Sequence, residues 1–250
     1  MQPLFIAGPC FIESALLLDS VAQRLAQLRD KLQLNVYFKA SFDKANRTSL
    51  SSFRGPGLER GLQMLADVGQ RYGLPLTTDV HESYQAAAVG QVCDVLQIPA
   101  FLCRQTDLLV ASAKTGKIVT VKKAQFLSGE DMKYPVEKCR EAGAKEVWLT
   151  ERGTTFGYNN LVVDFRNLPI MQQWADRVIM DCTHSVQRPG GANGKTGGDR
   201  QFVPSMALAA KAFGANGYFF ETHPTPDAAL SDGPNMLPLD HIEQVIQSLL

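Results

Sequence analysis

The sequence predicts an α/β protein built as a single (β/α)8 barrel, the TIM-barrel class, over residues 1–250. Short strand-like runs alternate with amphipathic segments, the runs number eight, and a polar residue lies in, at or just after the end of each one. Alternating strands and helices are typical of a parallel sheet with helical crossovers. Eight such units close into a barrel of about this length.

The strand-like runs are rich in β-branched and aromatic residues, as strands buried on both faces require. No Pro-, Gly- or Ser-rich linker divides the series, so we expect one catalytic domain over the whole chain. In chain order the predicted strands are Leu4–Ala7, Val36–Ala40, Pro75–Asp79, Val95–Ile98, Ile118–Lys122, Val147–Thr150, Val178–Asp181 and Tyr218–Glu221.

The segments between the runs repeat apolar residues at helical spacing. In Ala15–Gln33, Val21, Leu25, Leu28 and Leu32 follow one another at intervals of three or four residues, which places them on one face of a helix. The other predicted helices are Gly57–Tyr72, Ala86–Gln91, Asp131–Ala142, Met171–Ala175, Val203–Ala212 and Asp240–Leu249.

The composition argues against several classes of partner. The 25 basic and 25 acidic residues cancel, so no net charge attracts nucleic acid or an anionic membrane. No apolar run is long enough to span a bilayer, and the start MQPLFIAGPC lacks the features of a signal peptide. Five cysteines without a C-x-x-C motif do not describe a disulfide framework. We therefore expect a cytoplasmic protein.

Polar residues at the ends of the predicted strands indicate where the site lies. The carboxyl ends of all strands in a (β/α)8 barrel meet at one rim, which is where such enzymes carry their active sites. Any one of these residues could be a solvated loop residue, but their convergence on one rim favours a functional site. They are Cys10, Lys39, Ser41, Lys44, Asp79, Gln97, Lys122, Arg152, His184 and Glu221.

Four of the candidate residues offer donors to a metal ion. Cys10, His184, Glu221 and Asp232 follow the first, seventh and eighth strands, which become neighbours when a barrel closes. One thiolate, one imidazole and two carboxylates suit a single divalent ion such as Fe²⁺, Zn²⁺ or Mn²⁺. Taken alone, Cys10 could equally be a small buried residue, and Asp232 a turn former.

Lys39, Lys44, Lys122 and Arg152 predict a local cationic pocket in an otherwise neutral protein. Lysine binds phosphate as a point charge and arginine as a planar fork, so the pocket calls for a small, highly anionic substrate. A second mechanism stays open, because Lys39 or Lys122 could form a Schiff base, as in barrel aldolases.

The Gly-rich stretch Arg188–Arg200 has no dinucleotide-binding or P-loop spacing. We expect a long loop after the seventh strand. It is either a lid over the site or a surface excursion.

From Lys39 to Ser49, KASFDKANRTS, the chain resembles the 3-deoxy-D-manno-octulosonate-8-phosphate synthase family, also called 2-dehydro-3-deoxyphosphooctonate aldolase. The likeness covers essentially the whole chain. Further matching segments are AGPC (7–10), RGPG (54–57), TDVHE (78–82), QIPAFLCRQTDL (97–108), VKKAQF (121–126), RGTTFGYNNLVVD (152–164), DCTHSVQRPGG (181–191), ETHP (221–224) and SDGPN (231–235).

The resemblance implies a (β/α)8-barrel transferase that condenses phosphoenolpyruvate, D-arabinose 5-phosphate and water. The products are the eight-carbon 3-deoxy sugar acid phosphate, used for the inner core of lipopolysaccharide, and inorganic phosphate. Carried onto this chain, the family pattern implies that Lys44, Lys122 and Arg152 hold phosphoenolpyruvate. Further family roles fall on Lys39, Ser41, Asp79 and Gln97 around that substrate, on Asn46, Arg47 and Thr48 for the pentose phosphate, and on Lys44, Asn46, His184 and Asp232 for catalysis.

Two further expectations follow from the same resemblance. Arg104 in this family reaches the phosphate site of a neighbouring subunit, which implies a homo-oligomer, usually a tetramer. The family contains metal-independent members with Asn at the position of Cys10. The cysteine here, together with His184, Glu221 and Asp232, implies the metal-dependent class.

The nearest alternative is the related 3-deoxy-heptulosonate-7-phosphate synthase, which uses erythrose 4-phosphate. Its pocket typically reads K-P-R-T-S, whereas this chain has an additional Asn46 between Lys44-Ala45 and Arg47. A sialic acid synthase usually carries a further C-terminal domain. A non-catalytic binding barrel would leave the polar rim unexplained.

Overall fold

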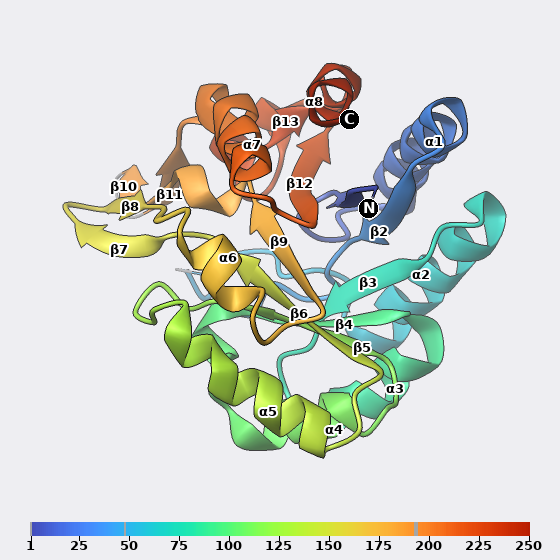
Figure 1. The fold of residues 1–250 in the computed structure, drawn as a ribbon. Coiled ribbons are helices and arrows are strands. Elements are labelled where there is room, and N and C mark those ends of the chain that lie inside the picture. The colour runs from blue at the N-terminus through green and yellow to red at the C-terminus, as the bar shows by residue number, and fades with distance from the viewer. Residues whose placement is uncertain (1, 48, 193–194) are drawn as a thin grey trace.

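The structure, a computed structural model, describes residues 2–47, 49–192 and 195–250. Within these residues eight parallel strands pair in the order β1-β2-β3-β4-β5-β6-β9-β12, and β12 pairs back with β1 (Figure 1). The predicted closed barrel is confirmed. Its strands are β1 Leu4–Gly8, β2 Asn35–Lys39, β3 Leu76–Asp79, β4 Val95–Ile98, β5 Ile118–Lys122, β6 Glu146–Glu151, β9 Arg177–Asp181 and β12 Gly217–His223, with β13 Leu237–Pro238 added beside β12.

Helices surround the barrel, and most begin and end within two residues of the prediction (Figure 1). Among the described residues, no helix is long and apolar enough to cross a membrane. The helices are α1 Ala15–Leu32, α2 Leu58–Tyr72, α3 Ala86–Val92, α4 Thr106–Ala113, α5 Lys133–Glu141, α6 Asn167–Met171, α7 Val203–Ala212 and α8 Ile242–Leu249.

Two helices differ from the prediction. Helix α4 was missed because its sequence TDLLVASA is largely apolar and has little amphipathic contrast to reveal a helical period. Helix α6 begins at Asn167, four residues before the predicted start at Met171. Pro169 lies in its first turn, where the missing backbone N–H is not needed, so the proline is compatible with this helix.

The interior of the barrel is apolar at its amino-terminal end and charged at its carboxyl-terminal end. On β12, Phe219 belongs to the interior apolar cluster and Glu221 is the next residue on the same face. On β9, Ile179 and Asp181 repeat this arrangement. Phe219 and Asp181 are direct partners in the parallel pairing, so they point to the same side. The rest of the cluster is Leu4, Ile6, Val95, Ile118 and Trp148.

The first two strands approach each other closely where the charged layer begins. A Cβ atom added to Gly8 would lie 1.9 Å from the carbonyl oxygen of Lys39. Only glycine therefore allows β1 to end beside Lys39, and this contact sets the position of the first lysine of the site.

Two antiparallel hairpins extend beyond the carboxyl ends of the strands. β7 Thr154–Gly157 pairs with β8 Asn160–Val162, and β10 Gln187–Ala192 pairs with β11 Lys195–Gly198. Strand β10 contacts β8, so the two hairpins lie side by side (Figure 1). The described part of the predicted long loop over Arg188–Arg200 forms the β10–β11 hairpin, and its role as a lid or a surface excursion stays a prediction. Backbone pairing forms this hairpin without the apolar alternation that would have revealed it.

We expect replacement of Trp148 by alanine to lower the free energy of unfolding by about 3–5 kcal/mol, because it empties the centre of the barrel. The indole is buried, packs edge-on against Tyr37 at a centroid distance of 5.3 Å, and donates its N–H to Glu146 at 2.7 Å. Chemical denaturation measures the change. The matched variant Trp174→Ala removes a partly buried indole and should cost less; equal losses would contradict the prediction.

Candidate active site

Lys39 lies in the charged layer between two carboxylates. Its Nζ atom is 3.3 Å from Asp79 Oδ2 and 3.4 Å from Glu221 Oε1, and it donates to the carbonyl of Cys10 at 2.8 Å. Burial alone lowers the pKa of Lys39, but Asp79 and Glu221 outweigh burial and raise that pKa above its usual value. Lys39 is therefore a protonated ammonium.

Asp79 connects three strands of the site. Its carboxylate accepts a hydrogen bond from Gln97 Nε2 at 2.7 Å and one from the hydroxyl of Ser41, besides its ion pair with Lys39. Burial by itself raises the pKa of Asp79, yet the Lys39 ammonium and other nearby cations hold it below its usual range. Asp79 is consequently a carboxylate that holds Lys39, Ser41 and Gln97 in one layer.

Cys10, Glu221 and Asp232 bring their donor atoms within 4.8 Å of one another, and all three side chains are buried. The Cys10 thiol donates to Asp232 Oδ2 at 3.3 Å. His184, the fourth predicted ligand, lies beside this group, with its Nε2 3.5 Å from Glu221 Oε1 and 3.9 Å from Asp232 Oδ2. Residues more than 220 positions apart in the chain thus meet at one point.

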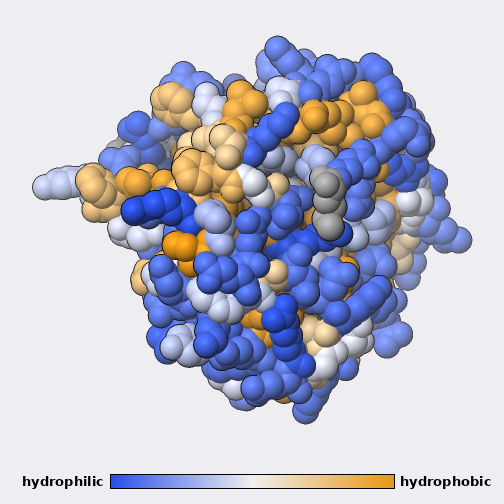
Figure 2. Space-filling view, in the orientation of Figure 1, coloured by the Kyte–Doolittle hydropathy of each residue, from blue (hydrophilic) through white to orange (hydrophobic). Residues whose placement is uncertain are grey.

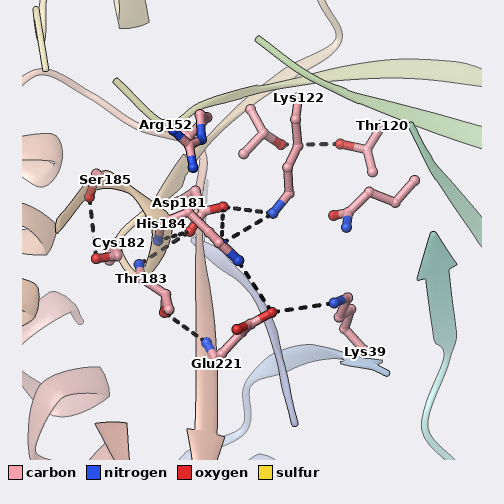
Figure 3. A network of polar contacts seen from close by, with 12 residues as sticks. Lys39, Thr120, Lys122, Arg152, Asp181, Cys182, Thr183, His184, Ser185 and Glu221 are labelled. Carbon is pink, nitrogen blue, oxygen red and sulfur yellow. Dashed lines mark hydrogen bonds and ion pairs between the residues drawn. The ribbon is translucent and has the colours of Figure 1, made fainter. Parts of the chain in front are cut away.

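Asp181 orients the imidazole of His184. The ring donates from Nδ1 to Asp181 Oδ2 at 2.7 Å, which leaves Nε2 facing Glu221 (Figure 3). Asp181 also accepts from Lys122 Nζ at 2.6 Å, and the Thr183 hydroxyl accepts from the backbone N–H of Glu221 at 2.8 Å. A carboxylate on one ring nitrogen and a free second nitrogen is the usual arrangement of a metal-binding histidine.

The residues present fit a borderline divalent ion. Sulfur, nitrogen and carboxylate oxygen converge, and Glu221 Oε2 is buried without a hydrogen-bond partner in the described part of the chain. The Lys44 ammonium lies against this cluster, 2.9 Å from Cys10 Sγ and paired with Asp232, so the cluster already attracts a cation. Burial raises the pKa of the Cys10 thiol well above its ordinary value, and a bound ion would have to displace that proton.

Two of the cations predicted to bind an anion, Lys122 and Arg152, are buried beside this cluster. Arg152 is buried; its Nη2 donates to Gln187 Oε1 at 2.7 Å, whereas its Nη1 has no partner among the described residues. Burial lowers the pKa of Arg152, although the nearby carboxylates of Asp181, Glu151 and Asp232 act in the opposite direction. Lys122 Nζ lies 3.9 Å from the ring centroid of Phe219. An unpaired guanidinium N–H in a buried pocket of cations is suited to an anion.

Three further predicted residues, Asn46, Arg47 and Arg104, are more exposed than this cluster. Asn46 and Arg104 are exposed on separate loops, and within the described residues neither donates to the buried network. Arg47 is partly exposed and donates from Nη2 to the carbonyl of Leu230 at 3.0 Å, which links its loop to the one that carries Asp232. Thr48 lies outside the described residues.

Asp181, Thr183 and Gln187 take part in the site although sequence reasoning assigned them no role. Asp181 ends a predicted strand, and its spacing of three residues from His184 could have identified it. Gln187 is different, because only the observed hairpin brings its side chain to Arg152 and Asp232. Thr183 acts through a contact with the backbone of β12, which sequence spacing does not reveal.

A buried ion pair between Lys123 and Glu151 holds the backbone at Arg152 in place. Lys123 Nζ is 3.4 Å from Glu151 Oε1, and both side chains are completely buried. Glu151 Oε1 also accepts the backbone N–H groups of Arg152 and Gly153, at 2.8 and 2.6 Å, and Oε2 accepts from Asn167 at 2.8 Å. The pair therefore fixes the backbone of Arg152 and Gly153, and with it the base of the Arg152 side chain.

Fold and site together define a (β/α)8 barrel with a cluster of potential metal ligands beside the buried cations Lys122 and Arg152. Comparison with known proteins agrees. Residues 1–249 match the model of the DAHP synthetase I family, and the chain belongs to that family.

The curated relatives make the comparison more specific. The chain is 55% identical over 250 residues to a 2-dehydro-3-deoxyphosphooctonate aldolase of Cyanothece sp., covering 100% of this chain and 92% of that one. It is 53% identical over 257 residues to the protein of the same name in Helicobacter hepaticus, covering 98% and 95%. A third relative of that name, in Nitratidesulfovibrio vulgaris, is 53% identical over 244 residues, covering 98% and 89%.

We expect Lys123→Met to lower the free energy of unfolding by about 3–5 kcal/mol, because the buried Glu151 carboxylate loses its ion-pair partner. Adding Glu151→Gln should recover part of this loss, as measured by urea unfolding of the single and double variants. The control Lys133→Met breaks an exposed pair with Glu137 and should cost about 0.5 kcal/mol or less. A double variant as unstable as Lys123→Met would contradict the charge argument.

Proposed function

We propose that this chain condenses phosphoenolpyruvate with D-arabinose 5-phosphate and water, forming 3-deoxy-D-manno-octulosonate 8-phosphate and inorganic phosphate. This is a step toward the inner-core sugar of lipopolysaccharide. The observation that carries the proposal is that three clustered metal-type donors, with His184 beside them, lie at the same rim as the buried cations Lys122 and Arg152. The relatives carry the name 2-dehydro-3-deoxyphosphooctonate aldolase, which supports the same reaction.

In this proposal the anion pocket binds phosphoenolpyruvate. Lys122 and Arg152 hold its phosphate and carboxylate, and the unpartnered Nη1 of Arg152 is the free donor for one of them. Lys44 completes the positive charge at the rim. Lys39, Ser41, Asp79 and Gln97 form the wall beside the substrate, as their mutual contacts support.

The pentose phosphate enters from the more exposed side of the rim. Asn46 and Arg47 belong to the loop that follows β2, and we assign both of them, with Thr48 as the next residue in the sequence, to this substrate. Lys44, Asn46, His184 and Asp232 are the proposed catalytic residues. Arg104 is exposed after β4, which leaves its side chain accessible to the phosphate site of a neighbouring subunit.

During the reaction the enol carbon attacks the pentose aldehyde and water adds to C2, after which phosphate leaves with C–O cleavage. Lys122 and Arg152 orient one substrate against the other, and positioning of this kind contributes about 7–11 kcal/mol to lowering a barrier. Lys44 and the neighbouring cations stabilise negative charge that develops on the aldehyde oxygen. A divalent ion held by Cys10, His184, Glu221 and Asp232 would supply further positive charge to orient that oxygen.

At Lys39, one of the two lysines considered for a Schiff base, the environment disfavours that mechanism. Its ammonium lies between Asp79 and Glu221 and has a raised pKa, so it lacks the free electron pair that attacks a carbonyl. The erythrose 4-phosphate alternative is disfavoured by the relatives, because the named proteins at 53–55% identity are octonate aldolases.

We further propose a homotetramer working in the cytoplasm, with residues 1–250 as one catalytic domain and no nucleic acid or membrane partner. Exposed aromatic residues support assembly: Phe156 and Tyr158 on the β7–β8 hairpin are 73% and 98% exposed. Figure 2 shows hydrophobic surface where this hairpin protrudes. The five cysteines, all among the described residues, are unpaired, as a reducing compartment requires.

The reaction and the metal are tested together by phosphate release from phosphoenolpyruvate plus arabinose 5-phosphate. Dipicolinate should abolish the release, and Mn²⁺ or Zn²⁺ should restore it, because Cys10, His184, Glu221 and Asp232 form one ion site. Turnover that resists the chelator would remove the metal requirement and keep the reaction. Turnover with erythrose 4-phosphate alone would overturn the substrate assignment.

Arg152→Lys should lower kcat/KM for phosphoenolpyruvate about 10–100-fold, because an ammonium cannot replace the planar fork of a guanidinium. Steady-state phosphate release at varied phosphoenolpyruvate measures the change. Arg166→Lys is the matched control, since Arg166 is exposed and pairs with Asp164. Unchanged kinetics in Arg152→Lys would contradict the proposed role of the pocket.

A further inference from the structure

Gln187 lies between the two halves of the site. It is the first residue of β10 and follows His184 by three positions. Its Oε1 accepts from Arg152 Nη2 at 2.7 Å, and its Nε2 donates to Asp232 Oδ1 at 3.3 Å. One side-chain amide thus connects the anion pocket with the donor cluster.

The two carboxylate oxygens of Asp232 have different partners, and Gln187 contacts only one of them. Oδ1 accepts from Gln187, whereas Oδ2 accepts from Cys10 Sγ at 3.3 Å and pairs with Lys44. The Oδ2 atom is also the one that lies 3.9 Å from His184 Nε2. Gln187 therefore holds the carboxylate turned so that a single oxygen faces the other donors.

The backbone around Gln187 is seated directly against the loop of Asp232. Gln187 pairs with Gly198 in the β10–β11 hairpin, and a Cβ atom on Gly198 would lie 1.3 Å from Asn235 Oδ1. Asn235 is fully buried, and its backbone N–H donates to the carbonyl of Asp232 at 2.8 Å. The hairpin and the Asp232 loop consequently leave no room for a side chain at Gly198, and this contact fixes the distance that Gln187 spans.

We propose that Gln187 is a positioning residue that sets the orientation of Asp232 as a metal ligand and the orientation of Arg152 as an anion ligand. The inference rests on the proposed function, because it assumes an ion at Cys10, His184, Glu221 and Asp232. The amide suits this task because it offers an acceptor to the guanidinium and a donor to the carboxylate. A side chain of similar length without the amide keeps the volume and loses both contacts.

The test is a Co²⁺ titration of metal-free protein, in which the thiolate-to-cobalt absorption band reports ligation by Cys10. The wild-type chain should bind one ion, and Gln187→Met should bind it about 10–100-fold more weakly, as is typical when a hydrogen bond to a metal ligand is removed. The matched control is Gln27→Met, which changes an exposed glutamine of α1 and should bind like the wild type.

Thermal unfolding of the metal-free variants separates positioning from folding. An unchanged melting temperature in Gln187→Met, together with weaker Co²⁺ binding and a raised KM for phosphoenolpyruvate, supports the inference. A Co²⁺ affinity in Gln187→Met equal to that of the wild type overturns the inference. Weaker Co²⁺ binding accompanied by a lowered melting temperature also overturns it, because the loss then comes from misfolding and not from a misplaced ligand. A wild-type protein that binds no Co²⁺ would instead refute the proposed metal site, a different failure.

Discussion

Both halves of the site depend on the carboxylate of Asp181. It accepts from Lys122 at 2.6 Å on the side of the anion pocket and from His184 at 2.7 Å on the side of the donor cluster. Burial opposes this charge, but His184 and Lys122 outweigh burial and hold the pKa of Asp181 below its usual range. Because the carboxylate is anchored at the end of β9, it fixes the lysine and the imidazole relative to the barrel.

The same principle extends through the whole charged layer. Lys39 with Asp79 and Glu221, Lys44 with Asp232, and Lys122 with Asp181 are buried or nearly buried ion pairs. Pairs of this kind contribute little net stability, because desolvation offsets most of the attraction. These ion pairs instead fix positions, because each one holds a cation or a carboxylate where a substrate or a metal ion would contact it. The apolar cluster beneath them supplies the rigid base.

Some parts of the fold and of the site could be predicted from the sequence, and others could not. The strand-end residues Lys39, Asp79, Gln97, Lys122 and Glu221 were predictable, because parallel strands in a closed barrel bring their carboxyl ends to one rim. Helix α4 was not predicted, because a largely apolar helix carries little period in its sequence. The β10–β11 hairpin was not predicted either, because its stability comes from backbone pairing and from contact with neighbouring loops.

The sequence by itself determined the barrel class, the rim and the residue types of the site, since hydrophobic period and strand-end chemistry are local properties. Only the tertiary structure decided which residues touch. The donor set joins Cys10 to Asp232 across almost the entire chain, and barrel closure between β1 and β12 is what brings them together. The role of Gln187 likewise arises from two contacts that local spacing cannot encode, because Arg152 and Asp232 meet it from different loops.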